Sequence, residues 1–340
     1  MAAYSITSFL IFPFFLLVLA LTPLSISGFP HSSSASNQLD FWSKNVLTNM
    51  PDTVLSKLSP LSKHDSDYLS SLLVSKKSIS SDAKFCSKAN LACSFASKGL
   101  QKIKNGYNEY GAISTSHASE EVDPNSFFML SKFEKGNKVH LPNLNDQIPP
   151  RSFLPYEIAS KISISPNDLQ NMFPASFTSP ATKEAIQTTL LYCSAPTLKG
   201  EIKSCPKSLE EMIEFSKNVL GEKELVALTS KSTKGSGKEL LIGNVKELDA
   251  KKVVSCHEVF LPFAAYFCHL LSSTRLYAVD LVELETRAPV NTVLAICHMD
   301  TSSWPANHVA FKILKSSPGK AEACHWFTQI DLVWIGNGKN

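Results

Sequence analysis

Four Cys-His dipeptides constrain the fold of this chain more than any other feature. They are separated by 10, 27 and 25 residues and stand at Cys256-His257, Cys268-His269, Cys297-His298 and Cys324-His325. At least three of them fall in short β-branched and aromatic runs that are typical of strands. Neighbouring side chains of a strand point to opposite faces, so each strand sends its cysteine one way and its histidine the other. The pattern predicts interior disulfides and a separate polar site where the imidazoles meet.

Gathered imidazoles are candidate metal ligands. A neutral imidazole binds Cu, Zn, Ni and Fe well, and the affinity order of a His-only site outside the cell favours Cu(II) over Zn. Mixed Cys/His zinc binding is an alternative, although the sequence has no CxxC knuckle. In the other alternative the histidines only satisfy buried backbone groups. The predicted metal ligands are His257, His269, His298 and His325.

The amino terminus predicts secretion. An apolar run of 13 residues, 9–21, is too short to span a bilayer and is followed by small residues near Ser25 and Ser27. We therefore expect a signal peptide over residues 1–27 and an extracellular mature chain without a membrane segment. All eight cysteines follow this segment, and an oxidising compartment favours disulfides. Two local pairings are expected, Cys193 with Cys205 and Cys86 with Cys93.

The mature chain divides into a tail and a dense carboxy-terminal domain. We expect short helices over 28–75, a flexible and poorly packed linker with one Cys pair over 76–126, and a domain over 127–340. The segment 206–221 predicts a helix, with Pro206 in its first turn and Gly221 as its C-terminal cap. Six runs after Gly237 predict strands, over 239–245, 252–260, 275–284, 290–299, 307–314 and 321–335. The fold class is therefore α+β, with a mostly antiparallel carboxy-terminal sheet and a few helices.

Charge and motifs exclude several functions. A formal net charge of +3 is far below the concentrated positive field that nucleic-acid binding needs. The sequence contains no GxSxG or HExxH motif, and no glycosidase carboxylate pair can be placed from spacing. A common hydrolase is therefore not indicated.

The Cys-His spacing resembles the signature of the plant BURP domain over roughly residues 127–335. Segments in the same order support the resemblance: Phe127-Phe128, 151–155 (RSFLP), the loop between Cys193 and Cys205, and 300–311 (DTSSWPANHVAF). Within that family the chain looks most like the noncatalytic beta subunit of polygalacturonase. Those subunits carry an array of Phe-x-x-Tyr repeats, whereas this chain has one degenerate copy at Tyr107–Tyr110. The chain thus resembles a short form without the array.

The resemblance implies two functions. The first is a non-catalytic protein of the cell wall or apoplast that binds pectin or modulates a polygalacturonase catalytic subunit. The second is a copper-dependent peptide cyclase, acting on its own tail or on a separate peptide, that crosslinks a Tyr or Trp side chain. In the second case the four histidines hold copper, and His308 is an extra ligand, a proton carrier or only a capped strand-end residue. A core peptide in the tail then includes Gln38, Leu39 and Trp42, although Trp42 also fits an apolar anchor.

Overall fold

The computed structural model describes residues 34–75, 78, 83–93, 123–145 and 148–338. Within these residues the helices are α1 (Ser34–Asn45), α2 (Asp52–Leu55), α3 (Lys63–Val74), α4 (Ala83–Lys88), η2 (Leu130–Phe133), α6 (Tyr156–Ala159), α7 (Pro166–Met172), η3 (Pro174–Phe177), α8 (Pro180–Ser194), α9 (Leu209–Leu220) and α10 (Val309–Leu314). The strands are β1 (Lys138–His140), β2 (Glu201–Ser204), β3 (Leu225–Leu228), β4 (Glu239–Leu248), β5 (Val254–Phe260), β6 (Ala264–Leu271), β7 (Thr274–Val282), β8 (Pro289–His298), β9 (Ala323–Trp326) and β10 (Leu332–Gly336).

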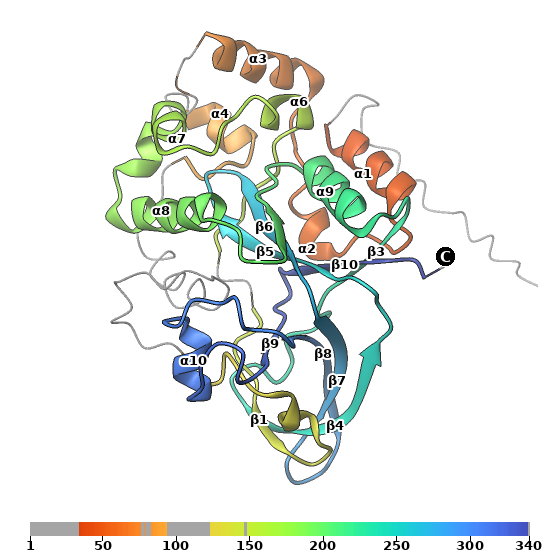
Figure 1. Cartoon of the computed structure of the whole chain (residues 1–340). Helices are drawn as coiled ribbons and strands as arrows, with labels where there is room; N and C mark the ends of the chain where they lie inside the picture. Colours follow the sequence, from red (N-terminus) through yellow and green to blue (C-terminus); the bar gives the residue numbers. More distant parts are fainter. Residues whose placement is uncertain (1–33, 76–77, 79–82, 94–122, 146–147, 339–340) are drawn as a thin grey trace, which may run out of the picture. The chain divides into compact units, whose positions relative to one another are not determined.

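The strands form two five-stranded sheets (Figure 1). The first sheet has the order β1-β4-β7-β8-β9 and the second the order β2-β6-β5-β10-β3. Every pairing between named strands is antiparallel. Together with the preceding helices, these sheets confirm the predicted α+β class and the antiparallel character of the carboxy-terminal region.

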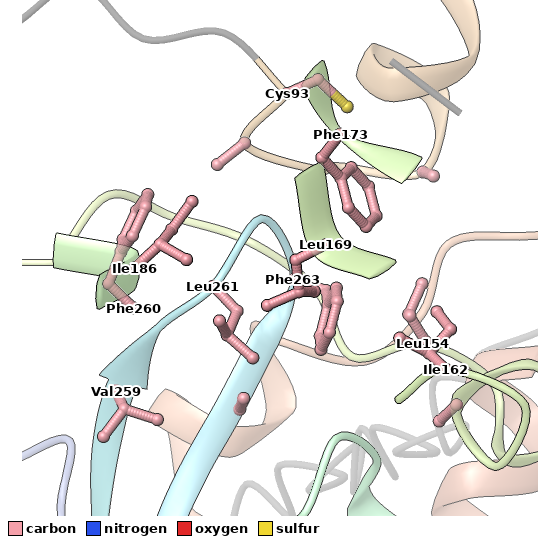
Figure 2. Close-up of a cluster of buried hydrophobic side chains, with 14 of the residues drawn as sticks. Cys93, Leu154, Ile162, Leu169, Phe173, Ile186, Val259, Phe260, Leu261 and Phe263 are labelled. Carbon is pink, nitrogen blue, oxygen red and sulfur yellow. The ribbon is translucent and has the colours of Figure 1, made fainter. Parts of the chain in front are cut away.

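The second sheet is covered on both faces, so that nearly every side chain of β5 and β6 is buried, including the polar Ser255, His257 and Glu258 of β5. One face packs Val254, Tyr266 and Leu270 into a core shared with α9, while Val259 and Phe267 belong to a core on the other side. Figure 2 shows part of the latter core, where Phe260 and Phe263 lie near side chains of α7 and α8. Burial on both faces also forces the polar side chains of these strands to find partners inside the protein.

Three of the sequence-based element predictions need correction. The run 321–335, predicted as one strand, forms two strands, β9 and β10, which belong to different sheets. The predicted helix begins later than expected, because Ser208 caps it by accepting a hydrogen bond from the Glu211 amide, and Pro206 lies before the cap. Gly221 ends it in the left-handed conformation, as expected. The run 307–314 forms helix α10 instead of a strand, because the His308 ring caps its first turn at the Ala310 amide. Its apolar residues suit a buried single helical turn as well as a strand.

The amino-terminal helices pack onto the second sheet. Trp42 of α1 is buried with its ring centroid 5.5 Å from that of Trp334 on β10, and its indole N–H donates to the Thr48 carbonyl at 2.9 Å. The chain after α1 then bridges to Leu225 of β3, which covers that edge of the sheet. The predicted helical segment is thus anchored to the sheets that follow it.

Residues 83–93 depart from the expected poorly packed linker. They contain helix α4, and the disulfide between Cys86 and Cys93 lies buried in the same core as Phe173 and Phe263 (Figure 2). The expectation failed because the Ser- and Lys-rich composition around this segment hides a short apolar stretch at Phe85–Cys93. Residues 94–122, which make up most of the expected linker and include the Tyr107–Tyr110 repeat, lie outside the described residues. The expected signal peptide also lies outside them.

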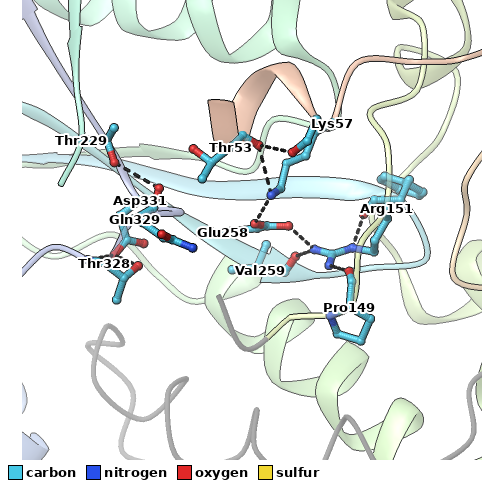
Figure 3. Close-up of polar contacts among 12 residues, drawn as sticks. Thr53, Lys57, Pro149, Arg151, Thr229, Glu258, Val259, Thr328, Gln329 and Asp331 are labelled. Atoms are coloured by element: carbon cyan, nitrogen blue, oxygen red, sulfur yellow. Dashed lines mark hydrogen bonds and ion pairs between the residues drawn. The ribbon is translucent and has the colours of Figure 1, made fainter. Parts of the chain in front are cut away.

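A buried ionic network joins the amino-terminal segment to the second sheet (Figure 3). The Arg151 Nη2 donates to Glu258 Oε1 at 2.7 Å and to the Val259 carbonyl at 2.9 Å. Its Nε and Nη1 donate to the carbonyls of Phe263 and Pro149. Lys57 Nζ lies 3.1 Å from the other carboxylate oxygen of Glu258. The guanidinium therefore has a partner on each nitrogen, which is what a fully buried charge requires.

Candidate functional site

Two cross-strand disulfides hold the strands that carry the four histidines. Cys256 of β5 stands directly opposite Cys268 of β6, and Cys297 of β8 directly opposite Cys324 of β9; in each pair the Cα atoms are 4.0 Å apart. All four sulfurs face apolar cores. The local pairings of Cys193 with Cys205 and of Cys86 with Cys93 are also confirmed. No cysteine among the described residues is a free thiol.

The imidazoles lie on the opposite faces of these strands and meet between the two sheets. Histidines of consecutive Cys-His pairs lie next to each other, and the last ring, His325, also lies next to the first, His257. The four rings therefore form a closed cycle. The ring centroids are 5.6 Å apart for His257 and His269, 6.0 Å for His269 and His298, 5.6 Å for His298 and His325, and 5.7 Å for His325 and His257. The second sheet supplies the first two rings and the first sheet the other two. We call these four side chains the histidine cluster.

A hydrogen-bond acceptor holds the Nδ1 atom of three of the four cluster histidines. Nδ1 of His257 lies 3.3 Å from Asp331 Oδ1, and that of His325 lies 3.3 Å from the Trp326 carbonyl. Both partners only accept hydrogen bonds, so each Nδ1 carries the proton. In this tautomer Nε2 carries the lone pair with which imidazole binds a metal.

His298 also has an acceptor at Nδ1, whereas His269 has a carboxylate nearby but no hydrogen bond. Nδ1 of His298 lies 3.1 Å from Thr274 Oγ1, whose own hydroxyl hydrogen goes to the Leu271 carbonyl, so the threonine oxygen accepts from the ring. Nδ1 of His269 lies 3.5 Å from Oε1 of the buried Glu201. Neither nitrogen of His269 has a hydrogen-bond partner among the described residues. Carboxylate, hydroxyl and carbonyl partners of this kind are typical of histidines that hold metal ions.

Burial favours the neutral form of three of the cluster histidines. Desolvation lowers the pKa of His269 and lowers that of His298 well below its ordinary value, in both cases assisted by repulsion from neighbouring imidazoles. The same desolvation lowers the pKa of His325 to about 3. In these three rings the neutral form, which is the form that binds a metal, is therefore favoured over the charged form.

The cluster lines a small cavity of about 30 Å³. Its other walls are aromatic and aliphatic, with one carboxylate: Phe127, Leu198, Glu201, Phe267, Leu271, Trp304 and His308. His308 is separate from the ring cycle, because its Nδ1 caps helix α10 and its ring packs against that of Trp304 at 4.4 Å between centroids. The capping interpretation of His308 is thus the one that its geometry supports, although it caps a helix and not a strand end.

The four imidazoles are donors that suit a transition metal, but their rings lie slightly too far apart to bind one ion together. Four nitrogens bound to one ion at about 2 Å in a tetrahedron place neighbouring ring centroids about 5 Å apart, less than the separations seen here. Accordingly, no three His, Cys, Asp or Glu side chains in the described part of the chain are arranged to hold an ion as they stand. The Nδ1–H tautomer of His257, His298 and His325 and the buried, unpartnered nitrogens of His269 nevertheless match what four-imidazole coordination requires, after a small inward movement of the rings.

The core-peptide residues lie elsewhere. Gln38 is buried and its Oε1 accepts from the Ser59 amide at 2.8 Å, Leu39 is partly exposed on α1, and Trp42 packs on Trp334. This packing supports the apolar-anchor interpretation of Trp42, since α1 would have to leave the sheet to reach the cluster.

Several site residues were not found from the sequence. Asp331, Glu201 and Thr274 lie beside the histidines, yet nothing in the sequence marked these three residues, although Glu201 stands in the loop between Cys193 and Cys205 and Asp331 in the run 321–335. Trp304 is different, because it stands in the 300–311 segment that the sequence analysis singled out. Nothing in the sequence indicated that the side chain of Trp304 lies beside the histidines.

Comparisons with known proteins place the chain in a family. The sequence model of the BURP domain matches residues 126–336. The chain is 32% identical to BURP domain-containing protein 16 of Oryza sativa subsp. japonica over 97% of this chain and 98% of that protein. It is 39% identical to polygalacturonase-1 non-catalytic subunit beta of Solanum lycopersicum, and 36% identical to polygalacturonase 1 beta-like protein 1 of Arabidopsis thaliana. These two matches cover 63% and 71% of this chain but only 34% and 39% of the relatives.

No helix in the described ranges is both long and apolar enough to cross a membrane. The match over the whole carboxy-terminal domain, the four Cys-His pairs and the near-complete alignment with the rice protein lead to one conclusion. The chain belongs to the BURP domain family.

Proposed function

We propose that this protein is a secreted, non-catalytic component of the cell wall or apoplast that associates with a polygalacturonase catalytic subunit. The observation that carries this proposal is its 36–39% identity to polygalacturonase non-catalytic subunits across the BURP domain. Because the chain spans only about a third of those relatives, the shared domain is the part that would make the association. Four disulfides support an extracellular site of action.

The test is co-purification with a plant polygalacturonase. The mature chain and the enzyme are mixed and run on size exclusion, with the enzyme's rate and heat inactivation measured in parallel. A joint peak and altered heat inactivation are expected. A separate peak for each protein at low ionic strength, together with unchanged enzyme kinetics, contradicts the proposal.

Pectin is the proposed polysaccharide partner. A chain of net charge +3 attracts a polyuronate only weakly, and salt screens the attraction. Retention on immobilised polygalacturonate is therefore expected at low salt and is lost near 0.15 M. Equal retention on a neutral glucan column contradicts an electrostatic interaction with pectin.

A second function rests on the histidine cluster. We propose that His257, His269, His298 and His325 hold a copper ion, with zinc as the competing ion. A bound copper ion supplies one-electron oxidation of an aromatic group, which is the chemistry of peptide crosslinking. The protein's own part is to fix the Nδ1–H tautomers of His257 and His298 through Asp331 and Thr274 and to shield the rings from water.

Mass spectrometry separates the two functions. The protein is loaded with Cu(II) in air, and residues 28–126 are mapped for loss of two hydrogens, with dioxygen as the oxidant. Loss in that segment supports cyclisation of the protein's own tail, and the same loss in an added Tyr- or Trp-containing peptide supports a separate substrate. An unchanged mass in both leaves the non-catalytic function as the supported one.

A further inference from the structure

We propose that Trp304 closes the histidine cluster to all but water-sized or azide-sized ligands and donates its indole N–H to the ligand that binds there. This inference rests on the metal centre proposed above and names the class of ligand that the centre binds. That class consists of small hydrogen-bond acceptors of one to three atoms, such as water, hydroxide and azide. It assigns a ligand-selecting role to a residue that is not itself a metal ligand.

The first observation is the position of the Trp304 ring. It lines the cavity with its centroid 5.4 Å from that of His298 and 4.4 Å from that of His308. The side chain is only 7% exposed and packs with Phe127 and Phe311 in one apolar cluster. Its backbone is fixed as well, since the Trp304 amide donates to the Thr301 carbonyl at 3.1 Å. Trp304 is therefore a firmly held wall of the cavity beside one cluster histidine.

The second observation is an unused donor. The indole Nε1 of Trp304 is buried and has no hydrogen-bond partner among the described residues. Native proteins rarely leave such a group unsatisfied, so each instance calls for an explanation. Trp334 also has an unpaired Nε1, but it lies in the core beside Trp42 and does not line the cavity. Of these two indole donors, only that of Trp304 belongs to a residue that lines the cavity, where a bound molecule can accept its hydrogen.

The third observation is size. The cavity of about 30 Å³ is larger than the roughly 10–15 Å³ that one water molecule needs and much smaller than the cavity of about 150 Å³ that holds benzene. A phenol or indole ring is several times larger, and the described walls are packed aromatic and aliphatic side chains. A Tyr or Trp of a peptide therefore reaches the cluster only if Trp304 swings away. The closed arrangement selects small acceptors and holds aromatic substrates outside.

The experiment uses the full mature chain loaded with Cu(II). The copper content per chain is measured first, and azide is then titrated while the charge-transfer absorption is followed. Imidazole and 4-methylphenol serve as bulky probes. Three variants are compared: Trp304→Phe keeps the ring without the N–H, Trp304→Ala opens the wall, and Trp334→Phe removes the other unpaired indole as a matched control.

The proposal predicts distinct results for each variant. Trp304→Phe keeps one copper ion but binds azide about tenfold more weakly, as expected for one lost hydrogen bond, while Trp334→Phe binds azide like the unaltered protein. Trp304→Ala gains binding of imidazole or 4-methylphenol, which the unaltered protein excludes. Far-ultraviolet circular dichroism and a thiol count verify that each variant is folded and disulfide-bonded.

Two results overturn the inference. One is equal azide affinity in Trp304→Phe and the unaltered protein, and the other is ready binding of 4-methylphenol by the unaltered protein. Either result leaves the copper centre standing, because copper content is measured independently. Failure of the unaltered protein to bind copper removes the centre itself, and the ligand selection with it. If Trp304→Ala does not fold, the comparison of probe sizes in the unaltered protein still decides the question of closure.

Discussion

Replacing Arg151 by Met is expected to be among the most destabilising single changes in this protein. The guanidinium is fully buried and donates to one carboxylate and three backbone carbonyls, with Glu258 Oε1 at 2.7 Å. Methionine fills a similar volume but removes the charge and every donor. Glu258, whose side chain is 1% exposed, then keeps Lys57 as its cation but loses its shortest contact.

The magnitude follows from the burial of the pair. Breaking a buried ion pair by removing one partner costs about 3–5 kcal/mol, because the other charge is left insufficiently compensated. The three orphaned carbonyls act in the same direction. The measurement is urea unfolding at pH 7 with disulfides intact. The matched control is Arg275→Met, whose partner Glu247 lies 3.8 Å away with both side chains about half exposed; because solvent screens such a pair, the free energy of unfolding should stay within the error of the assay.

A double variant tests whether Arg151 and Glu258 act as a coupled pair. Arg151→Met with Glu258→Leu removes both charges and should recover part of the stability lost in Arg151→Met, since no charge remains to be compensated except that of Lys57. A loss below about 1 kcal/mol in Arg151→Met, or a double variant less stable than both single variants, would refute the assignment of this network as a coupled buried unit.

Three further predictions concern the cluster and its supports. In the metal-free protein, His325 binds its proton near pH 6.5 when unfolded but only near pH 3 when folded. Its contribution is therefore present above pH 6.5 and falls by about 3 kcal/mol on acidification to pH 4.5; urea midpoints in a pH series should show this slope, and His325→Gln should make it shallower, with His269 and His298 supplying the remainder. Trp42→Ala should cost about 3–5 kcal/mol by emptying the site against Trp334, measured by the same unfolding assay, and a loss within the error of the assay would deny α1 its anchoring role. Replacing Cys297 and Cys324 by Ala should weaken copper binding, because the pair fixes two ligands, whereas calorimetry should find it unchanged when the distant pair Cys86 and Cys93 is replaced.

Alternation along strands made the histidine cluster predictable. In β5 and β8 the cysteine and the following histidine must face opposite ways, and the structure places Cys256 in a core and His257 in the cluster. The local rule does not say which cysteines pair, since that depends on strand register. Only the pairing of β5 with β6 and of β8 with β9 sets Cys256 opposite Cys268 and Cys297 opposite Cys324.

Long-range packing explains what the sequence did not reveal. Glu201 follows a loop with no catalytic motif and reaches His269 because β2 pairs with β6. The run 307–314 has the composition of a strand, and a capping contact from His308 made it a helix. Likewise Phe85 and Cys93 lie in a polar stretch, but the core of α7 and α8 buries them.

Copper content is the most direct test of the central claim that the four imidazoles form one binding centre. Native protein and a His269→Ala, His298→Ala double variant are exposed to limiting Cu(II), desalted and analysed for metal, with free thiols counted in both. The account predicts one tightly held ion per native chain, none in the double variant, and no free thiols in either. Stoichiometric copper in the double variant, or none in the native chain, would contradict it.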